Sequence, residues 1–420
     1  MIAVIFATLM AVSVGSFLKL ANHENRLSNI AFHSNSSLNL AEGGLEMALY
    51  ALNNEDFSGW RLTGTTAVMN RREVDLGKNT VGIINARILN FDKNPTVQAE
   101  GRIDLPNRPS VTKQVEIKLI RRSLFANGIT ARNGVTFKGG NAYVDSYSSS
   151  SGVPSSRMEE NHDNGSVASV SVETEAVSIS NAKIYGYVST GGSEPSVGPN
   201  GKIFGKDTPS GVNKDPNRIA LDFAADFPEV VPPSNYDGGY IPNLSRGTLG
   251  DRNATVPTVY RVGRISVKSN DVLSIQGPVV LHVLGNVDVK GEVVIENRPG
   301  NFAVIYLDDD LDIGGNGAVN NLTNRPESLL IYGSNPVRQT IKLHGNGILY
   351  AAVYAPNASL ELKGGGNSGA MGGAVVANDV FINGNYQFHY DEDLADFGRD
   401  TSYRMDKWRE LHLAADRVSF

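Results

Sequence analysis

Apolar residues over the first 53 positions change from a continuous run to a one-sided stripe. No side chain from Met1 to Leu18 is charged, and beyond Leu18 the apolar positions recur at combined steps of three and four residues. That period is typical of an amphipathic helix, and no proline interrupts it before Pro95. The pattern predicts one helix to about Asn53, roughly 80 Å long at 1.5 Å per residue. The alternative is two helices joined by a hinge near residues 19–26.

The apolar face of this helix is expected to pack against other helices or against the rest of the chain. We predict packing by Ile5, Leu9, Val12, Leu20, Leu27, Ile30, Leu38 and Leu45.

The uncharged run of residues 1–18 is long enough, at roughly 27 Å, to cross most of a hydrocarbon core. A membrane anchor is the favoured interpretation, with a secretory signal or a buried core helix as alternatives. Lys19 and Arg26 follow the run, which by the positive-inside rule would leave the rest of the chain in the cytoplasm. A basic leader removed upstream of Met1 would reverse that orientation.

Two kinds of β pattern follow the helix. Residues 56–122 contain β-branched runs separated by Asn and Pro, which predicts a small antiparallel sheet packed on the stalk. Later apolar runs begin at Val279, Ala303, Leu329, Ala351 and Ala374, so they recur every 22–26 residues with Gly and Asn between them. That period predicts a β-solenoid, and we favour a right-handed parallel β-helix over residues 123–396. A β-sandwich or jelly roll is the alternative.

The predicted fold is therefore mainly β with a long N-terminal α-helix. A Pro- and Gly-rich stretch at 193–260 is expected to leave the solenoid wall, as a contact surface or as a passive loop. Residues 397–420 are expected to form a C-terminal cap, with a short helix over the last open coil. The stalk is assigned to residues 1–55.

Composition narrows the class of protein. The 420 residues contain no cysteine, which excludes disulfides, thiolate nucleophiles and Cys-based metal sites. The net charge of −6 argues against nucleic acid as a partner. A protein of this size without cysteine is typical of a bacterial envelope.

Two stretches resemble known bacterial families. The segment "AEGGLEMAL" at 41–49 and the residues before it resemble the stalk of minor pilins in the type IV pilin superfamily. That resemblance implies a helix that anchors in the inner membrane and then packs in a filament core. Ile5 stands where many pilins carry Glu, which is a departure from the major-pilin pattern. Residues 138–152 and 349–394 resemble an envelope domain similar to bactofilin-type β-helices, for which no catalytic residues are implied.

Candidate chemistry is sparse. Asp308, Asp310 and Asp312 would share one face of a continuous strand, and they are the candidate ligands for calcium, the one cofactor considered. A solvated acidic turn is the alternative. His389 is interpreted as a hydrogen-bonded structural residue near the solenoid end. Nucleophile elbows, phosphate loops and His-based metal motifs are absent from the sequence, so we expect no enzyme and no catalytic residues.

Two hypotheses for function follow. The first is a pilin-like structural subunit that displays a β-helix on the cell surface or in a filament, with sister subunits as partners and a role in adhesion or assembly. The second is an envelope-tethered β-helix that binds or cleaves surface glycans. A secretion-system pseudopilin is a third, related option.

Overall fold

The computed structural model describes residues 2–77, 80–91, 94–105, 109–120, 123–139, 142–320, 322–364, 369–397, 403–412 and 416–420. The fold is mainly β with one long N-terminal helix among the described residues. Two compact units make up the chain. The first joins Met1–Arg122 to Asp400–Phe420, and the second is Ser123–Arg399.

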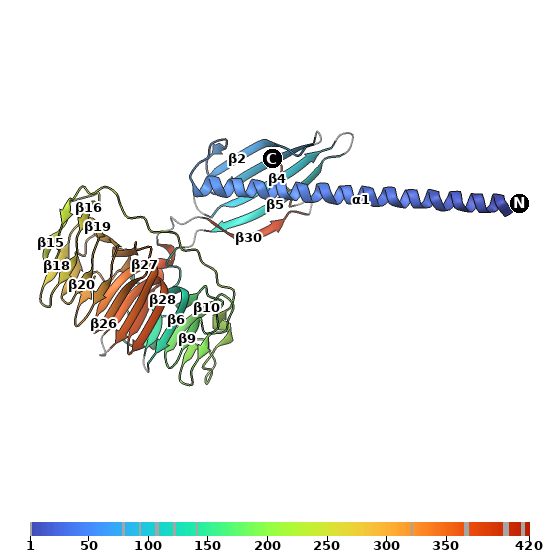
Figure 1. Ribbon diagram of the computed structural model, residues 1–420. Helices are drawn as coiled ribbons and strands as arrows, with labels where there is room; N and C mark the ends of the chain where they lie inside the picture. Colours follow the sequence, from blue (N-terminus) through green and yellow to red (C-terminus); the bar gives the residue numbers. More distant parts are fainter. Residues whose placement is uncertain are drawn as a thin grey trace. The chain divides into compact units, whose positions relative to one another are not determined.

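The N-terminal helix α1 runs without a break from Ile2 to Asn53 (Figure 1). The prediction of one helix is confirmed, and the alternative of two helices with a hinge at 19–26 is wrong. The helix ends where the Asn54 N–H and side-chain amide both donate to the Tyr50 carbonyl oxygen at 3.0 Å. Glu55 then takes a left-handed conformation with φ of 53°, a common helix stop.

The first unit also contains an antiparallel sheet, as predicted. Its strands in spatial order are β1 (Arg61–Thr63), β2 (Thr66–Asp75), β3 (Val81–Leu89), β4 (Thr96–Asp104), β5 (Val111–Ile120) and β30 (Arg404–Glu410). Alternate residues of β3 and β4 are buried against α1, because successive strand side chains point to opposite faces.

Among the described residues of α1, those of its last part pack on the sheet. The buried helix residues recur every three or four positions, as Ser37, Ala41, Leu45, Ala48 and Leu52. They contact a sheet core that includes Ile84, Ala86, Val97, Ala99 and Ile117.

A glycine allows the two backbones to approach closely. The Ser37 hydroxyl donates to the Gly101 carbonyl oxygen at 2.6 Å in a buried hydrogen bond. A Cβ on Gly101 would lie 2.0 Å from the Ser37 carbonyl oxygen and 2.6 Å from the Ala41 nitrogen. The helix therefore rests on the sheet at a position where no side chain fits.

The C-terminal tail does not form the predicted capping helix. Its described residues instead form β30, which pairs with β5 in the first unit, and residues 416–420 lie along the same sheet. Arg409 donates to Glu116 at 2.8 Å, and the Val418 N–H donates to Gln114 at 2.9 Å. The second unit is thus inserted between two neighbouring strands of one sheet.

The second unit consists of parallel strands in three columns, each hydrogen-bonded from strand to strand. The first column contains β14 (Tyr240–Ile241), β16 (Thr258–Val262), β19 (Pro278–Val283), β22 (Phe302–Leu307), β25 (Leu329–Gly333), β27 (Ile348–Gly364), β28 (Ala370–Gly384), β6 (Ile129–Lys138), β8 (Gly165–Ser169), β10 (Lys183–Thr190) and β13 (Ile219–Ala220).

The long strands β27, β28, β6 and β10 bend and take part in more than one column. The second column adds β17 (Ile265–Val267), β20 (Val287–Val289), β23 (Leu311–Ile313), β26 (Gln339–Gly345), β9 (Val177–Ile179) and β11 (Ser196–Val197). The third adds β15 (Gly247–Leu249), β18 (Val272–Ile275), β21 (Glu292–Ile295), β24 (Ala318–Val319), β29 (Gln387–Asp391), β7 (Tyr143–Tyr147) and β12 (Lys202–Phe204).

Short 3-10 helices lie between some of these strands. They are η1 (Met158–Glu160), η2 (Pro216–Arg218), η3 (Pro326–Ser328) and η4 (Glu392–Asp396).

The repeat read from the sequence matches the pairing register. Val279 pairs with Ala303, and Ala303 pairs with Leu329. Because the described strands of the second unit pair in parallel, an antiparallel sandwich is excluded for that unit. Inward residues of the three columns, such as Leu281, Ile313 and Ile295, form one continuous core.

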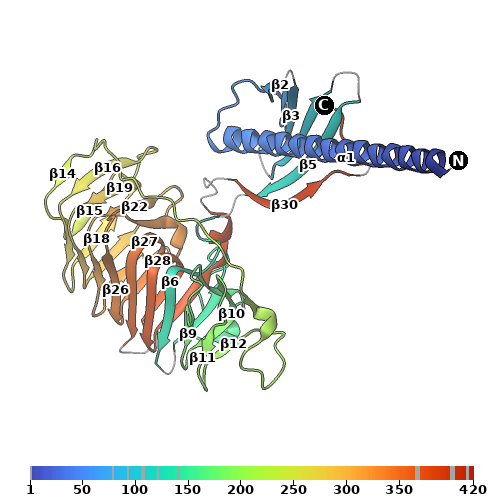
Figure 2. The same ribbon diagram turned by 45° about the vertical axis from the view of Figure 1, so that its right-hand side comes forward.

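The chain enters and leaves these columns in their middle. β28, near the end of the unit, pairs with β6 at its start (Figure 2). β29 likewise pairs with β7. From β6 the chain builds the columns toward β13. It then passes to β14 at the far end and builds back toward β28.

Residues 221–239, here called the strap, make that passage. The Phe223 N–H donates to the Thr190 carbonyl oxygen in β10, and the Gly238 N–H donates to the Val259 carbonyl oxygen in β16. Between these ends, Tyr354 of β27 donates to the Pro228 carbonyl oxygen at 2.7 Å. The predicted excursion at 193–260 is therefore too long, because β11, β12 and β13 at one end and β14 and β15 at the other lie in the columns.

Replacing Gly101 with Ala is expected to lower the free energy of unfolding of the first unit by about 1–3 kcal/mol, because the added methyl group overlaps the helix backbone. Both tryptophans, Trp60 and Trp408, belong to this unit, so their fluorescence during urea unfolding measures the effect. The control is Gly43→Ala, whose new Cβ would lie 3.8 Å from Ile84 Cδ1, an ordinary van der Waals contact. Equal stabilities of the two variants would contradict the account.

Candidate assembly surface

The part of α1 that precedes the sheet is exposed and carries many large apolar side chains. From Val12 to Phe32 every described residue except the half-buried Ala21 is exposed. So many large apolar side chains are rarely exposed together on one protein surface. The exposed ones here are Met10, Val12, Val14, Phe17, Leu18, Leu20, Leu27, Ile30 and Phe32. The first buried helix residue is Ser37. Figure 1 shows this N-terminal portion of α1 extending beyond the sheet.

The predicted packing residues fall into three groups. Leu45 is buried against the sheet and Leu38 packs partly against the same core. Val12, Leu20, Leu27 and Ile30 are exposed. Ile5 and Leu9 lie in the helix, but their side chains are outside the described residues.

Charges are unevenly distributed along the helix. Lys19, Arg26 and one carboxylate, Glu24, lie in the exposed portion, whereas Glu42 and Glu46 lie on the exposed side of the portion that packs on the sheet. No Lys or Arg occurs between Arg26 and Arg61. None of these five charged helix side chains forms an ion pair within the described part of the chain.

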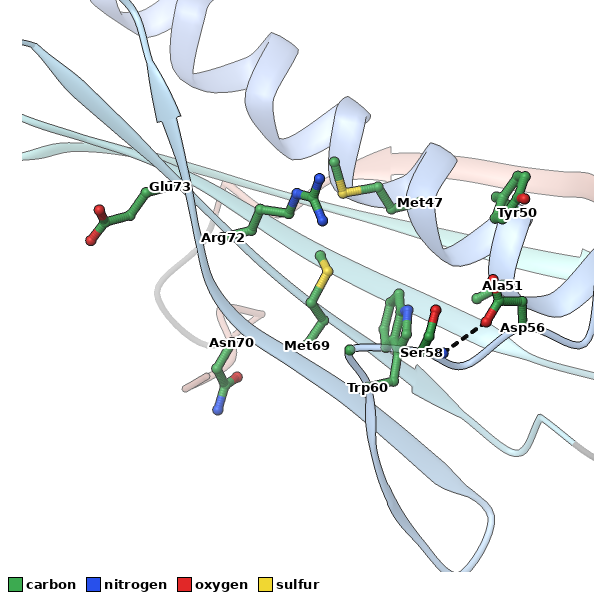
Figure 3. Close-up of a pocket in the computed structure, with 11 residues that line it drawn as sticks. Met47, Tyr50, Ala51, Asp56, Ser58, Trp60, Met69, Asn70, Arg72 and Glu73 are labelled. Atoms are coloured by element: carbon green, nitrogen blue, oxygen red, sulfur yellow. Dashed lines mark hydrogen bonds between the residues drawn. The ribbon is translucent and has the colours of Figure 1, made fainter.

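A groove of about 570 Å³ lies beside the C-terminal end of α1 (Figure 3). Met47 and Tyr50 of the helix, Trp60 of the following loop, and Met69 and Arg72 of β2 are among its lining residues. The register of β2 against β3 shifts between Met69 and Arg72, and such a bulge changes the direction in which side chains point. The groove is lined both by flexible apolar side chains, such as Met47 and Met69, and by charged ones, such as Arg72.

The three candidate calcium ligands do not come together. β22 ends at Leu307 and β23 begins at Leu311, so Asp308 and Asp310 lie in a bend and the predicted strand alternation fails. Asp308 accepts from Ser334 at 2.6 Å, Asp310 accepts from the Thr340 N–H at 2.7 Å, and Asp312 Oδ1 lies 2.8 Å from His344 Nε2. In the described part of the chain, no group of three or more His, Cys, Asp or Glu side chains is placed to hold a metal ion.

Sequence reasoning missed two consecutive side-chain contacts that involve the strap. Tyr236 Oη lies 2.6 Å from His282 Nδ1, and His282 Nε2 lies 2.9 Å from Asp308 Oδ2. The partners come from the strap, β19 and the bend after β22, so no local pattern indicated the contact. These two contacts attach the strap to the first column.

His389 is hydrogen-bonded, as interpreted, but it does not lie near an end of the columns. Its Nδ1 lies 2.6 Å from Asp145 Oδ1, and both side chains are buried. His389 belongs to β29 and Asp145 to β7. The pair therefore joins a strand from the C-terminal part of the second unit's sequence to one from its N-terminal part.

Two carboxyls that follow His389 have opposite electrostatic environments. Asp391 is fully buried, its Oδ2 has no hydrogen-bond partner among the described residues, and burial raises its pKa. For Asp393, burial acts in the same direction but is outweighed by hydrogen bonds from residues 148–150, which lower the pKa. Among the described residues, neither carboxyl lies in a group of side chains suited to a metal ion.

The chain is similar to one family model and to a solved pilin structure. Residues 248–397, within the second unit, match the model of a domain of unknown function, DUF7305. No curated protein matches the chain. Among solved structures, the competence-associated pilin ComZ of Thermus thermophilus aligns over 90% of this chain and 97% of that one, at 12% identity. The TM-score is 0.21, too low to support an argument about this chain.

Within the described residues, no helix combines the length and the hydropathy that a membrane span requires.

Asp391→Asn is expected to flatten the pH dependence of the stability of the second unit above about pH 4. A raised folded-state pKa means that the stability contributed by Asp391 is present below its unfolded pKa of about 3.9 and is lost as the pH rises through the folded value. Urea unfolding followed by tyrosine near-ultraviolet circular dichroism measures this.

The matched control is Asp393→Asn. Its carboxyl has a lowered pKa, so its contribution is present at neutral pH and is lost on acidification. The control should therefore destabilise the unit at pH 7 and have less effect near pH 3. The same pH profile for both variants would refute the assignment.

Proposed function

We propose that the chain is a pilin-like structural subunit that assembles through its N-terminal helix and displays the second unit. The observation that supports it is the division of α1 into a clamped and a free portion. Residues from Ser37 onward are fixed on the sheet, while large apolar side chains of the preceding residues remain uncovered.

The physical basis is burial of these apolar side chains against equivalent helices. An exposed stripe of Leu20, Leu27 and Ile30, among others, loses its contact with water when helices pack side by side. The clamp on the sheet stabilises the helix beforehand, so less conformational entropy is lost on association. The sequence resemblance of residues 41–49 to minor-pilin stalks supports the same proposal.

We infer a bacterial cell-envelope location from the same features. In this proposal the uncharged residues 1–18 hold the chain in the inner membrane before assembly, and they leave the bilayer when the filament forms. Sister subunits are then the partners.

We further propose that the second unit is a right-handed β-helix with a structural role and no catalytic activity. Parallel strands joined by crossover connections are almost always right-handed, because right-twisted strands favour that sense. Its outer surface would provide the contacts for adhesion or assembly.

Removal of residues 1–34 tests the proposal. Because the buried helix contacts begin at Ser37, residues 35–420 are expected to fold and to show native fluorescence from Trp60 and Trp408. In neutral detergent, sedimentation velocity should find self-association of the full chain and monomers of the shortened chain at the same concentration. Equal association of both chains, or a monomeric full chain, would contradict the proposal.

A further inference from the structure

The charges on α1 match a second copy of the same helix displaced along its axis. The two cations, Lys19 and Arg26, precede two of the three carboxylates, Glu42 and Glu46, by similar intervals, and the third carboxylate, Glu24, lies between the cations. Arg26 and Glu46 are 20 positions apart, and Lys19 and Glu42 are 23 positions apart. At 1.5 Å per residue, one displacement of about 30–35 Å brings each cation level with a carboxylate.

A cation from a second copy would relieve the repulsion between the carboxylates Glu42 and Glu46. Glu42 and Glu46 are exposed and four positions apart, where like charges destabilise an isolated helix by about 0.2–0.5 kcal/mol. No cation of the described chain pairs with either of them. Lys19 and Arg26 are exposed as well and equally lack an ion-pair partner in the described residues.

The same displacement also aligns apolar side chains. Leu27 precedes Met47 by 20 positions, and Ile30 precedes Tyr50 by the same interval. Met47 and Tyr50 line the groove beside Trp60. Leu27, Ile30 and Tyr50 are 53%, 48% and 62% exposed, so all three are free to make an intermolecular contact.

The directions of the side chains suit an open assembly. Each helix residue is rotated by about 100° from the last, so positions 20 apart point about 200° apart and positions 23 apart about 140°. Arg26 and Glu46 therefore point to nearly opposite sides of one rod. Two parallel copies related by translation need this arrangement, because the face that one presents must oppose the face that the other receives.

The geometry points to a parallel contact between two copies in which residues 19–30 of one helix lie along residues 42–50 of the next. The contact rests on the proposed function and specifies the partner surface for it. Because the two faces differ, the contact is heterologous and leaves one face of each copy free. Repetition builds a filament rather than a closed dimer.

A charge-swap series of the full chain in neutral detergent at low salt tests this contact. We expect K19E/R26E and E42K/E46K each to need about tenfold more protein for self-association, since attraction becomes repulsion at both pairs. The variant that carries all four changes should associate within about twofold of the unchanged chain. Half-variants that associate like the unchanged chain would overturn the contact and leave the proposed function intact. An unchanged chain that never associates would overturn both.

Disulfide trapping gives an independent readout, because the chain has no cysteine of its own. The double variant I30C/Y50C should form a ladder of dimers, trimers and larger species on oxidation, as a heterologous contact requires. The controls I30C and Y50C should remain monomeric on non-reducing gels. Strong dimers from I30C alone, with no ladder from the double variant, would show a symmetric contact and contradict the inference.

Discussion

The close contact between Ser37 of the helix and Gly101 of the sheet determines how the first unit is built. Since a Cβ at Gly101 would overlap the helix backbone, the helix can sit deep enough for the Ser37 hydroxyl to reach the Gly101 carbonyl oxygen. This contact also marks the point at which α1 leaves the sheet. Residues 12–32, which precede it, are exposed except for the half-buried Ala21, and their apolar side chains remain in water.

The second unit satisfies a different constraint. Because it is inserted between β5 and β30, which are neighbours in one sheet, both of its ends must return to that sheet. The columns meet this requirement by starting and finishing in their middle, where β6 pairs with β28 and β7 with β29. The strap is the consequence, since the chain must pass once along the first column to reach the far end.

The helix and the strand repeat could be predicted from the sequence, because both depend on the spacing of apolar residues along the chain. The period of three and four residues identified α1 to within its last residue, and the recurrence at Val279, Ala303 and Leu329 gave the pairing register of the columns. Contacts between segments distant in the sequence could not be predicted from it. The pairing of β30 with β5 and the contact of Tyr236 with His282 join distant segments that carry no shared signal.

The assembly surface was only partly predictable. The predicted packing residues recur along one stripe of the helix, but the sequence does not say that Leu45 packs on the sheet while Leu20 and Leu27 remain exposed. The charge interval between Arg26 and Glu46 was readable from the sequence. It gains meaning only when both side chains are known to be exposed and unpaired.

Residue-resolved amide hydrogen exchange along α1 tests the central claim most directly. In the dispersed protein, amides of residues 38–52 should exchange as slowly as those of β3 and β4, while amides of residues 12–32 exchange faster. On self-association the second group should slow markedly. Equal exchange rates for the two groups in the dispersed chain, or no change in residues 12–32 on association, would contradict a helix clamped at one end and assembled through the other.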